Sequence, residues 1–173
     1  MTMQKIPSQK QSQRLSEESI SKFALDRFNE VKKSRKLSEL ASYHFVNRFL
    51  IKVHDSDEFE IVEKIIKDSK NRVFSLSVAE YEKHLRIALT GSPTVQSHVD
   101  VIMQIYGHFA SYLDSYEKER IFSLIEKFKN EEISVGIMLS SINPIIFRID
   151  NLFLTSQSYF LLYSEPDMKN IFK

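Results

Sequence analysis

Apolar residues recur at every third or fourth position through most of the chain, which is the spacing of an amphipathic α-helix. One such run begins at Ser16 and ends in the basic segment KKSRK, and a second extends from about Ser38 to His54. No stretch shows the sustained alternation of apolar and polar residues that is typical of a β-strand. The pattern therefore predicts an all-α fold, a compact bundle of about seven to eight helices.

Short polar residues mark where several helices are expected to begin. Asp55, Ser77 and Asp114 are each followed three residues later by a glutamate, which is the sequence pattern of a capping box. Pro93 is expected at the first position of a helix that ends near Leu113, because proline there loses no helical hydrogen bond. These signals divide the middle of the chain into four further helices.

A proline sets the expected end of the next helix. The segment from about Glu132 is apolar, but Asn143 and Pro144 should break it, because proline disfavours the helical conformation of the preceding residue. A last helix is expected from about Asp150 to Tyr163. Two helices with a break between them are therefore predicted in this part of the chain.

Charge is distributed unevenly along the 173 residues, although the net charge is only +1. Residues 1–15 are rich in Gln, Lys and Ser and are expected to form a disordered basic tail, leaving 16–173 as a single helical domain. Residues 1–37 hold nine basic residues against four acidic ones, a net +5, and the remainder carries −4. A basic arm favours an anionic partner, although a solvated tail also collects lysines for solubility.

Cysteine is absent, which excludes disulfides, thiolate metal sites, thiolate-ligated iron–sulfur clusters and a cysteine nucleophile in this chain. The first residues lack the apolar segment of a signal peptide. The most apolar run, 133–147, is too short and too interrupted by polar residues to cross a bilayer. We therefore expect a soluble, cytoplasmic protein with no membrane partner.

The segment HVDVIMQIYGHF (98–109) places two kinds of residue on one helix. His98 is predicted to share a buried stripe with Val101, Ile102, Ile105, Phe109 and Tyr112. Asp100, Gln104 and His108 lie four residues apart on another face, where they could hold a ligand or bridge to a neighbouring helix. Spacing alone favours an exposed polar stripe. Gly107 is expected to have a packing role, because glycine inside a helix costs about 1 kcal/mol relative to alanine.

The chain resembles the YbgA-like family of domains of unknown function in three successive segments, HVDVIMQIYGHF, LDSYEKERIFSLIEKFKN and FLTSQSYFLLYSEP. An earlier segment, YHFVNRFLIKVHDS, resembles the stretch that precedes them in that family, so the resemblance covers about residues 35–166. It implies an all-α fold. The family occurs alone and as the C-terminal partner of a desulfidase domain that acts on thiouracil compounds or thiolated transfer RNA. The iron–sulfur chemistry belongs to that cysteine-bearing partner, which this chain does not match.

Several positions keep the family's pattern and others depart from it. The retained positions are His44, Arg48, His98, Val101, Met103, Gly107, Phe109, Gln157 and Tyr159. The departures are Val46 for Arg, Asp100 for Asn, Gln104 for His, Tyr106 for Gln, His108 for Tyr, and Asn143-Pro144 for Lys-His. The helical framework is thus retained, while basic groups and a histidine are missing from positions that could contact an anion.

The leading functional hypothesis is a non-enzymatic accessory module that binds transfer RNA or another structured RNA, alone or beside a separately encoded desulfidase. Basic and aromatic residues interleave in FALDRFNEVKKSRK and YHFVNRFLIK, which suits phosphate contacts with base stacking. The expected phosphate contacts are Lys32, Lys33, Arg35, Lys36 and Arg48. The residues expected to line any pocket are His44, His98, Asp100, Gln104, His108 and Gln157. No catalytic residue, metal ligand or cofactor is assigned.

Two other classes of function stay open. Thirteen phenylalanines and seven tyrosines exceed what a small bundle needs inside, which favours a protein-interaction or homo-oligomeric helical scaffold. Five histidines also allow a hydrolase-like or metal enzyme, but the chain has no H-E-x-x-H pattern, G-x-S-x-G elbow or glycine-rich phosphate loop. Glu80 and His84 are more often a surface contact than metal ligands. His44 and His98 are expected to be hydrogen-bonded core residues.

Overall fold

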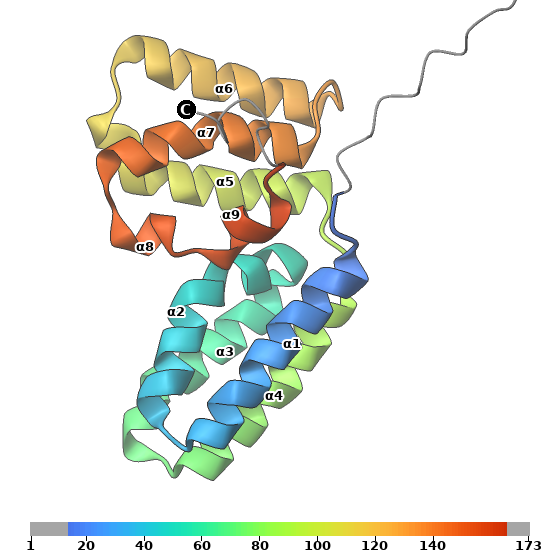
Figure 1. Cartoon of the computed structure of the whole chain (residues 1–173), viewed down its shortest axis with the longest axis vertical. Coiled ribbons are helices and arrows are strands. Elements are labelled where there is room, and N and C mark those ends of the chain that lie inside the picture. The colour runs from blue at the N-terminus through green and yellow to red at the C-terminus, as the bar shows by residue number, and fades with distance from the viewer. Residues whose placement is uncertain (1–13, 166–173) are drawn as a thin grey trace, which may run out of the picture.

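The computed structural model describes residues 14–165. Within this range the chain forms nine α-helices, two short 3-10 helices and no β-strand (Figure 1). The α-helices are α1 (Glu17–Ser34), α2 (Leu37–His54), α3 (Ser56–Asp68), α4 (Phe74–Thr90), α5 (Val95–Phe109), α6 (Ser115–Lys129), α7 (Val135–Ile149), α8 (Leu152–Thr155) and α9 (Ser158–Tyr163). The 3-10 helices are η1 (Ser69–Asn71) and η2 (Ala110–Tyr112). The all-α prediction is confirmed. Residues 1–13 of the expected disordered tail lie outside the described residues.

Helices α1 to α4 form an up-and-down bundle, the lower half of the molecule in Figure 1. Its core contains three aromatic rings, Phe28 and Tyr81 stacked with centroids 5.5 Å apart and Tyr43 edge-on to both. The Tyr43 hydroxyl donates to the carbonyl oxygen of Ala24 at 2.8 Å, which satisfies the polar end of a buried ring. Aromatic packing and one internal hydrogen bond therefore hold α1 against α2 and α4.

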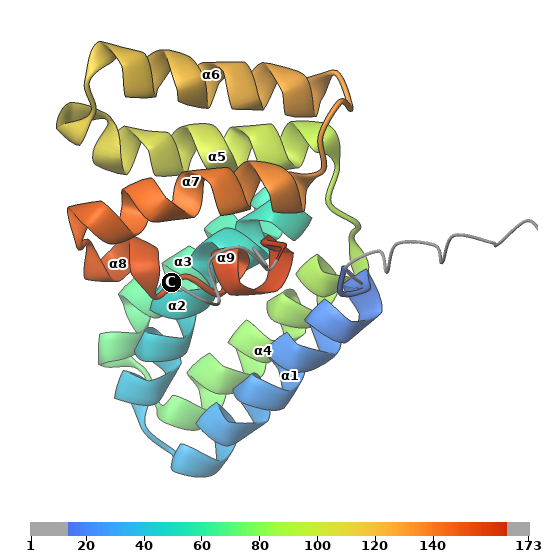
Figure 2. The same ribbon diagram turned by 45° about the horizontal axis from the view of Figure 1, so that its top comes forward.

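Helices α5, α6 and α7 lie side by side as the second half of the molecule (Figures 1 and 2). Helix α5 packs on α2, and α9 packs on both α2 and α7, so these contacts join the two halves. The Ser158 hydroxyl donates to Asn47 Oδ1 at 2.7 Å, and both residues are buried. A satisfied polar contact thus fixes the start of α9 against α2.

Two predicted helix starts are confirmed. Asp55 and Asp114 accept hydrogen bonds from the first turns of α3 and α6, and Glu117 completes a capping box with Asp114. Glu58, the expected partner of Asp55, instead contacts His84 Nδ1 at 2.6 Å. Asp55 therefore caps α3 without the reciprocal half of the box.

Two other predicted helix starts are wrong. Helix α4 begins at Phe74, so Ser77 lies inside the helix, where it is fully buried. Helix α5 begins at Val95, because Thr94 and Ser97 form a reciprocal capping box through their side chains. The sequence pattern missed this box because a serine, not a glutamate, occupies its third helical position.

The predicted break at Asn143 and Pro144 is also wrong, since α7 continues through Pro144 to Ile149. A proline inside a helix costs about 3 kcal/mol, and burial of Leu139, Ile142 and Ile146 on the same helix offsets that cost. The last predicted helix is instead divided into α8 and α9. At the division, Gln157 Nε2 donates to the carbonyl oxygens of Phe45 and Phe153, at 2.8 Å and 3.0 Å.

The end of α5 differs from its prediction in two ways. Tyr112 is 64% exposed, because α5 ends at Phe109 and η2 turns the chain away from the core stripe. Gly107 has no packing role, since a Cβ atom there would meet no other atom within 4 Å. His98, Val101, Ile102, Ile105 and Phe109 are buried as predicted. No helix in residues 14–165 combines the length and apolar character needed to cross a membrane.

Candidate functional site

The linker between α1 and α2 and the linker between α3 and α4 lie at the same end of the α1–α4 bundle (Figure 1). Residues 32–36 hold four basic residues and no acidic one, and residues 67–73 hold three basic residues and one acidic residue, Asp68. Arg35 and Val73 line the same shallow pocket, so the two segments are neighbours. We call residues 32–36 and 67–73 together the basic end.

Helices α2 and α4 both begin at the basic end, with their positive dipole ends towards it. Neither N-cap residue, Lys36 or Val73, accepts a first-turn hydrogen bond through its side chain. Free N–H groups at helix N-termini bind anions together with basic side chains. Both backbone and side chains therefore make the basic end electropositive.

Three of the five predicted phosphate contacts are engaged with acidic side chains of the chain itself. The pairs are Lys32–Glu82 at 3.0 Å, Lys33–Glu30 at 2.8 Å and Arg48–Glu63 at 3.7 Å. Arg48 lies about three turns along α2 from the basic end, within 6 Å of three phenylalanine rings. Arg35 and Lys36 are exposed and form no ion pair with a described residue. The structure thus brings together Lys32, Lys33, Arg35 and Lys36, but not Arg48.

His44 belongs to a closed hydrogen-bonded chain inside the α1–α4 bundle. Its Nδ1 lies 2.9 Å from the Tyr81 hydroxyl and its Nε2 lies 2.7 Å from Glu63 Oε2. Burial lowers the pKa of His44, although the neighbouring Glu63 carboxylate opposes the shift. Burial would raise the pKa of Glu63, but the bond from His44 and the charge of Arg48 outweigh it and lower the pKa. Both ring nitrogens of His44 are therefore occupied within the fold.

The predicted polar column on α5 is an exposed stripe, as spacing alone favoured. Asp100, Gln104 and His108 are all exposed, and Asp100 accepts a hydrogen bond from Gln96 Nε2 at 2.7 Å. The His108 ring lies at the edge of the stripe, 5.1 Å from the ring of Phe153. These three side chains do not face a cavity with His44 or His98, so the six predicted pocket residues do not converge.

Gln157 lines a pocket of about 510 Å³ between α1, α2 and the division of α8 from α9. Val46, which stands where the YbgA-like pattern has arginine, lines the same pocket. The Gln157 Oε1 atom is buried without a hydrogen-bond partner, while Nε2 holds two backbone carbonyls. The side-chain amide of Gln157 thus has a structural role, because it fixes the turn between α8 and α9 against α2.

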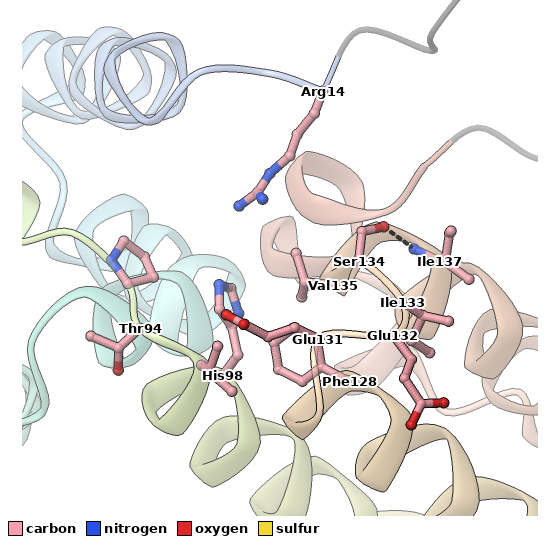
Figure 3. A pocket seen from close by; sticks show the side chains of 12 residues that line it. Arg14, Thr94, His98, Phe128, Glu131, Glu132, Ile133, Ser134, Val135 and Ile137 are labelled. Atoms are coloured by element: carbon pink, nitrogen blue, oxygen red, sulfur yellow. Dashed lines mark hydrogen bonds between the residues drawn. The ribbon is translucent and has the colours of Figure 1, made fainter.

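His98 faces a different pocket, of about 440 Å³, between the start of α5 and the connection from α6 to α7 (Figure 3). Phe128 and Val135 contribute to its apolar wall. Arg14 reaches into the pocket from the chain that precedes α1, and Figure 3 shows its guanidinium directed towards the imidazole. His98 itself is only 4% exposed.

The hydrogen bond between His98 and Tyr159 determines which ring nitrogen carries a proton. Burial, with a contribution from the charge of Arg14, lowers the pKa of His98 to about 4, so the ring is neutral at pH 7. The Tyr159 hydroxyl is fully buried, and His98 Nδ1, at 2.8 Å, is its partner. The hydroxyl donates to Nδ1, because its hydrogen would otherwise be buried without an acceptor. The ring proton is therefore on Nε2, which has no partner among the described residues.

A third polar cluster ties the start of α1 to the ends of α2 and α9. The Tyr163 hydroxyl donates to Glu17 Oε2 at 2.7 Å, and His54 Nε2 lies 3.4 Å from the same oxygen. His54 Nδ1 donates to the carbonyl oxygen of Leu50 at 2.8 Å. Burial would raise the pKa of Glu17, but His54, Tyr163 and Arg14 outweigh it and lower the pKa. These contacts join the two halves of the molecule beside the His98 pocket.

No group of three or more His, Asp or Glu side chains in residues 14–165 is arranged to hold a metal ion. Glu80 and His84 have separate partners: Arg72 Nη1 lies 2.6 Å from Glu80, and His84 contacts Glu58.

Comparison with known proteins bears on the whole arrangement. A family model described as a protein of unknown function (DUF1722) matches residues 48–164. The chain belongs to this family. It is also similar to the uncharacterized protein YbgA of Escherichia coli (strain K12), with 21% identity over 125 residues, 72% of this chain and 74% of the relative. The resemblance to YbgA-like domains is thus confirmed, and no solved structure matches the chain.

The family match and the structure together show what the sequence alone missed. The matched range includes His98 and the linker 67–73, but it begins after residues 32–36. Lys70 and Arg72 were not among the predicted contacts, because only the fold brings their linker beside Arg35. Arg14 was assigned to the tail, although it reaches the His98 pocket. The only sequence signal that could have indicated Lys70 as a contact was its positive charge in a short linker between two helices.

Proposed function

We propose that the chain is a non-enzymatic accessory module that binds structured RNA, with transfer RNA as the expected class, through the basic end. The supporting observation is that two linkers with seven basic residues and one acidic residue meet at the positive ends of α2 and α4. Phosphate groups are the ligands that basic side chains and helix N-termini bind together. The proposed contacts are therefore to the phosphate backbone.

The contacts differ in how readily they become available. Arg35 and Lys36 are exposed at the turn between α1 and α2, and Lys70 is exposed on η1. Lys33 would exchange Glu30 for phosphate at little cost, because exposed ion pairs contribute roughly 0–1 kcal/mol. Lys32 is held more firmly, because its two hydrogen bonds to Glu82 are partly buried. Arg48 is bound inside the fold and is not among the proposed contacts.

The proposal includes a place of action. We expect the module to act in the cytoplasm, alone or beside a separately encoded desulfidase whose substrate is thiolated RNA, because the resemblance to YbgA-like domains implies an association with such enzymes. The chain has no cysteine for iron–sulfur chemistry of its own, so the module would supply RNA binding and the partner the reaction.

Fluorescence anisotropy with bulk transfer RNA, thiolated and unthiolated, in a salt series tests the proposal. Log affinity should fall linearly with log salt concentration, because each phosphate contact releases counterions. The double variant Arg35→Ala/Lys36→Ala should weaken binding about tenfold or more at low salt and reduce the salt slope. Arg120→Ala/Lys127→Ala, which removes the same two residue types from exposed positions on α6, is the matched control.

Equal loss in the two double variants would show that net charge, not the basic end, governs binding, and would contradict the proposal. Absence of binding at low salt would overturn it outright. A preference for thiolated RNA would support the link with desulfidase chemistry.

A second candidate function, protein interaction or self-assembly, is favoured by one specific observation. Four large apolar or aromatic side chains are at least 64% exposed where α6 begins and α7 ends: Tyr112, Tyr116, Phe147 and Leu152. Arg148 Nη1 lies 2.5 Å from Glu117 Oε1, which holds these two helix ends together. Exposed apolar patches of this kind often mark protein interfaces. Light scattering that finds a monomer at high concentration would exclude the self-assembling version.

A further inference from the structure

The pocket beside His98 has the build of a small-molecule site, separate from the basic end. Its volume of about 440 Å³ lies within the range of ligand pockets, and its wall is mainly apolar. Its charged and imidazole groups come from three different parts of the chain: Arg14, His98 and the turn at Glu131. Such a set of convergent polar groups on an apolar wall fixes the orientation of a bound molecule.

Two of these groups, Arg14 and His98, are hydrogen-bond donors that can take a further acceptor. His98 lines the pocket with a side chain that is almost fully buried, and its Nε2–H has no partner among the described residues. Figure 3 shows Arg14 directed towards the imidazole. Arg14 has one ion pair within the described residues, a 3.4 Å contact to Glu17, and it is nearly half exposed. A carboxylate placed between the two donors would accept from both, and a charge-assisted bond to arginine is among the stronger hydrogen bonds.

The acidic groups at the pocket come from the turn that follows α6. Glu131 has a left-handed backbone conformation, φ 58°, because the chain closes the end of α6 with a bond from its N–H to the carbonyl oxygen of Phe128. In Figure 3 the Glu131 carboxylate is directed towards His98, while the Glu132 carboxylate is directed away. Glu131 forms no ion pair with a described residue. It is therefore available to a cationic group of a ligand.

We infer that this pocket binds a small zwitterion with an apolar body, of the amino-acid class. The carboxylate lies between the guanidinium of Arg14 and the Nε2–H of His98, the ammonium faces Glu131, and the apolar body lies against Phe128 and Val135. This arrangement uses the guanidinium of Arg14, the free nitrogen of His98 and the carboxylate of Glu131 together.

Titration of the full chain with three matched probes tests the inference. L-Phenylalanine carries both charges, 3-phenylpropionate only the carboxylate, and 2-phenylethylamine only the ammonium. The readout is the imidazole Cε1–H NMR signal of His98, assigned by its absence in His98→Phe. Phenylalanine should shift this signal saturably, phenylpropionate should bind about tenfold more weakly, and phenylethylamine should leave the signal unchanged.

Two matched variants then assign the groups. Arg14→Gln should weaken phenylalanine binding about tenfold, and Glu131→Gln should remove the advantage of phenylalanine over phenylpropionate. Glu132→Gln, the neighbouring control, should change neither. A His98 signal that responds to none of the probes, or an unchanged affinity in Arg14→Gln, would overturn the inference. Arg35→Ala/Lys36→Ala should bind phenylalanine normally, so the RNA proposal and the pocket proposal stand or fall separately.

Discussion

Two buried histidines, one in each half of the molecule, form the same kind of hydrogen bond through one ring nitrogen and differ at the other ring nitrogen. His44 in the α1–α4 bundle and His98 on α5 each bind a buried tyrosine hydroxyl through Nδ1, from Tyr81 and Tyr159. The other nitrogen of His44 is bound to Glu63, whereas that of His98 faces a pocket. Both ring nitrogens of His44 are therefore used within the fold, whereas one ring nitrogen of His98 is available to a ligand.

Because of this difference between the two histidines, the proposed binding sites of the two halves lie in different kinds of place, one at the surface and one in a pocket. In the α1–α4 bundle the hydroxyl of Tyr43 and both ring nitrogens of His44 have partners within the fold, and the proposed binding surface is the basic end. In the α5–α9 half an unpaired donor remains inside a pocket, and four large apolar side chains lie exposed at its far end. Burial of a histidine does not by itself indicate function; the partner of its second nitrogen does.

The largest expected effect is a loss of stability when His44, whose two ring nitrogens both have partners, is replaced. His44→Ala should lower the free energy of unfolding by about 3 kcal/mol or more, because it leaves a cavity, strands the buried Tyr81 hydroxyl and removes a partly buried hydrogen bond to Glu63. His98→Phe should cost only about 1–2 kcal/mol, since only the Tyr159 hydroxyl loses a partner. Urea unfolding measures both, with the exposed His108→Ala as the control, expected within about 0.5 kcal/mol of the parent. Equal costs for His44→Ala and His98→Phe would remove the distinction between the two sites.

The next effect is a pH dependence that the buried His98 imposes on stability. Its folded-state pKa of about 4 lies below the ordinary value of 6.5, so the unfolded chain takes up a proton first as the pH falls. The contribution of His98 to the free energy of unfolding should therefore be fully present above pH 6.5, decrease by on the order of 3 kcal/mol between pH 6.5 and 4, and change no further below pH 4. His44, whose pKa is also lowered by burial, contributes in the same direction.

Thermal or urea unfolding of the parent and of His98→Phe between pH 4 and 7 measures this slope. The variant should lose stability less steeply than the parent on acidification. Parallel curves would show that His98 titrates normally and is not buried as neutral imidazole.

The smallest effect distinguishes two glycines. Gly107→Ala should raise the free energy of unfolding by about 0.5–1 kcal/mol, because the position is helical and the new Cβ meets nothing within 4 Å. Gly91→Ala should destabilise, because its Cβ would lie 2.8 Å from the carbonyl oxygen of His54, where the two halves meet. Differential scanning calorimetry resolves both changes, and a stabilising Gly91→Ala would contradict the close approach.

Helical period was enough to predict the fold class and the buried side of α5, because side chains three and four residues apart share a face. It failed at Pro144 and Ser77, where tertiary burial, which no local pattern records, decided whether the helix continued. It placed Tyr112 in the core because it could not detect that α5 ends at Phe109.

The candidate sites were less accessible to prediction. The arm residues 32–36 were found from charge alone, but their neighbours at 67–73 are brought beside them only by the packing of α3 and α4. The six pocket residues were grouped by residue type and family position, whereas the structure distributes them over the bundle interior, an exposed stripe and two pockets. Which nitrogen of His98 is free depends on Tyr159, 61 residues away.

One NMR mapping experiment tests most directly whether RNA binds the basic end of the α1–α4 bundle and leaves the His98 pocket free. Backbone amide and histidine NMR signals of the labelled full chain are followed while transfer RNA is added at low salt. We predict shifts confined to the amides of residues 32–36 and 67–73, with the His98 signal unchanged. Shifts centred on His98, or on Tyr116 and Phe147 at the start of α6 and the end of α7, would contradict the assignment of RNA binding to the basic end.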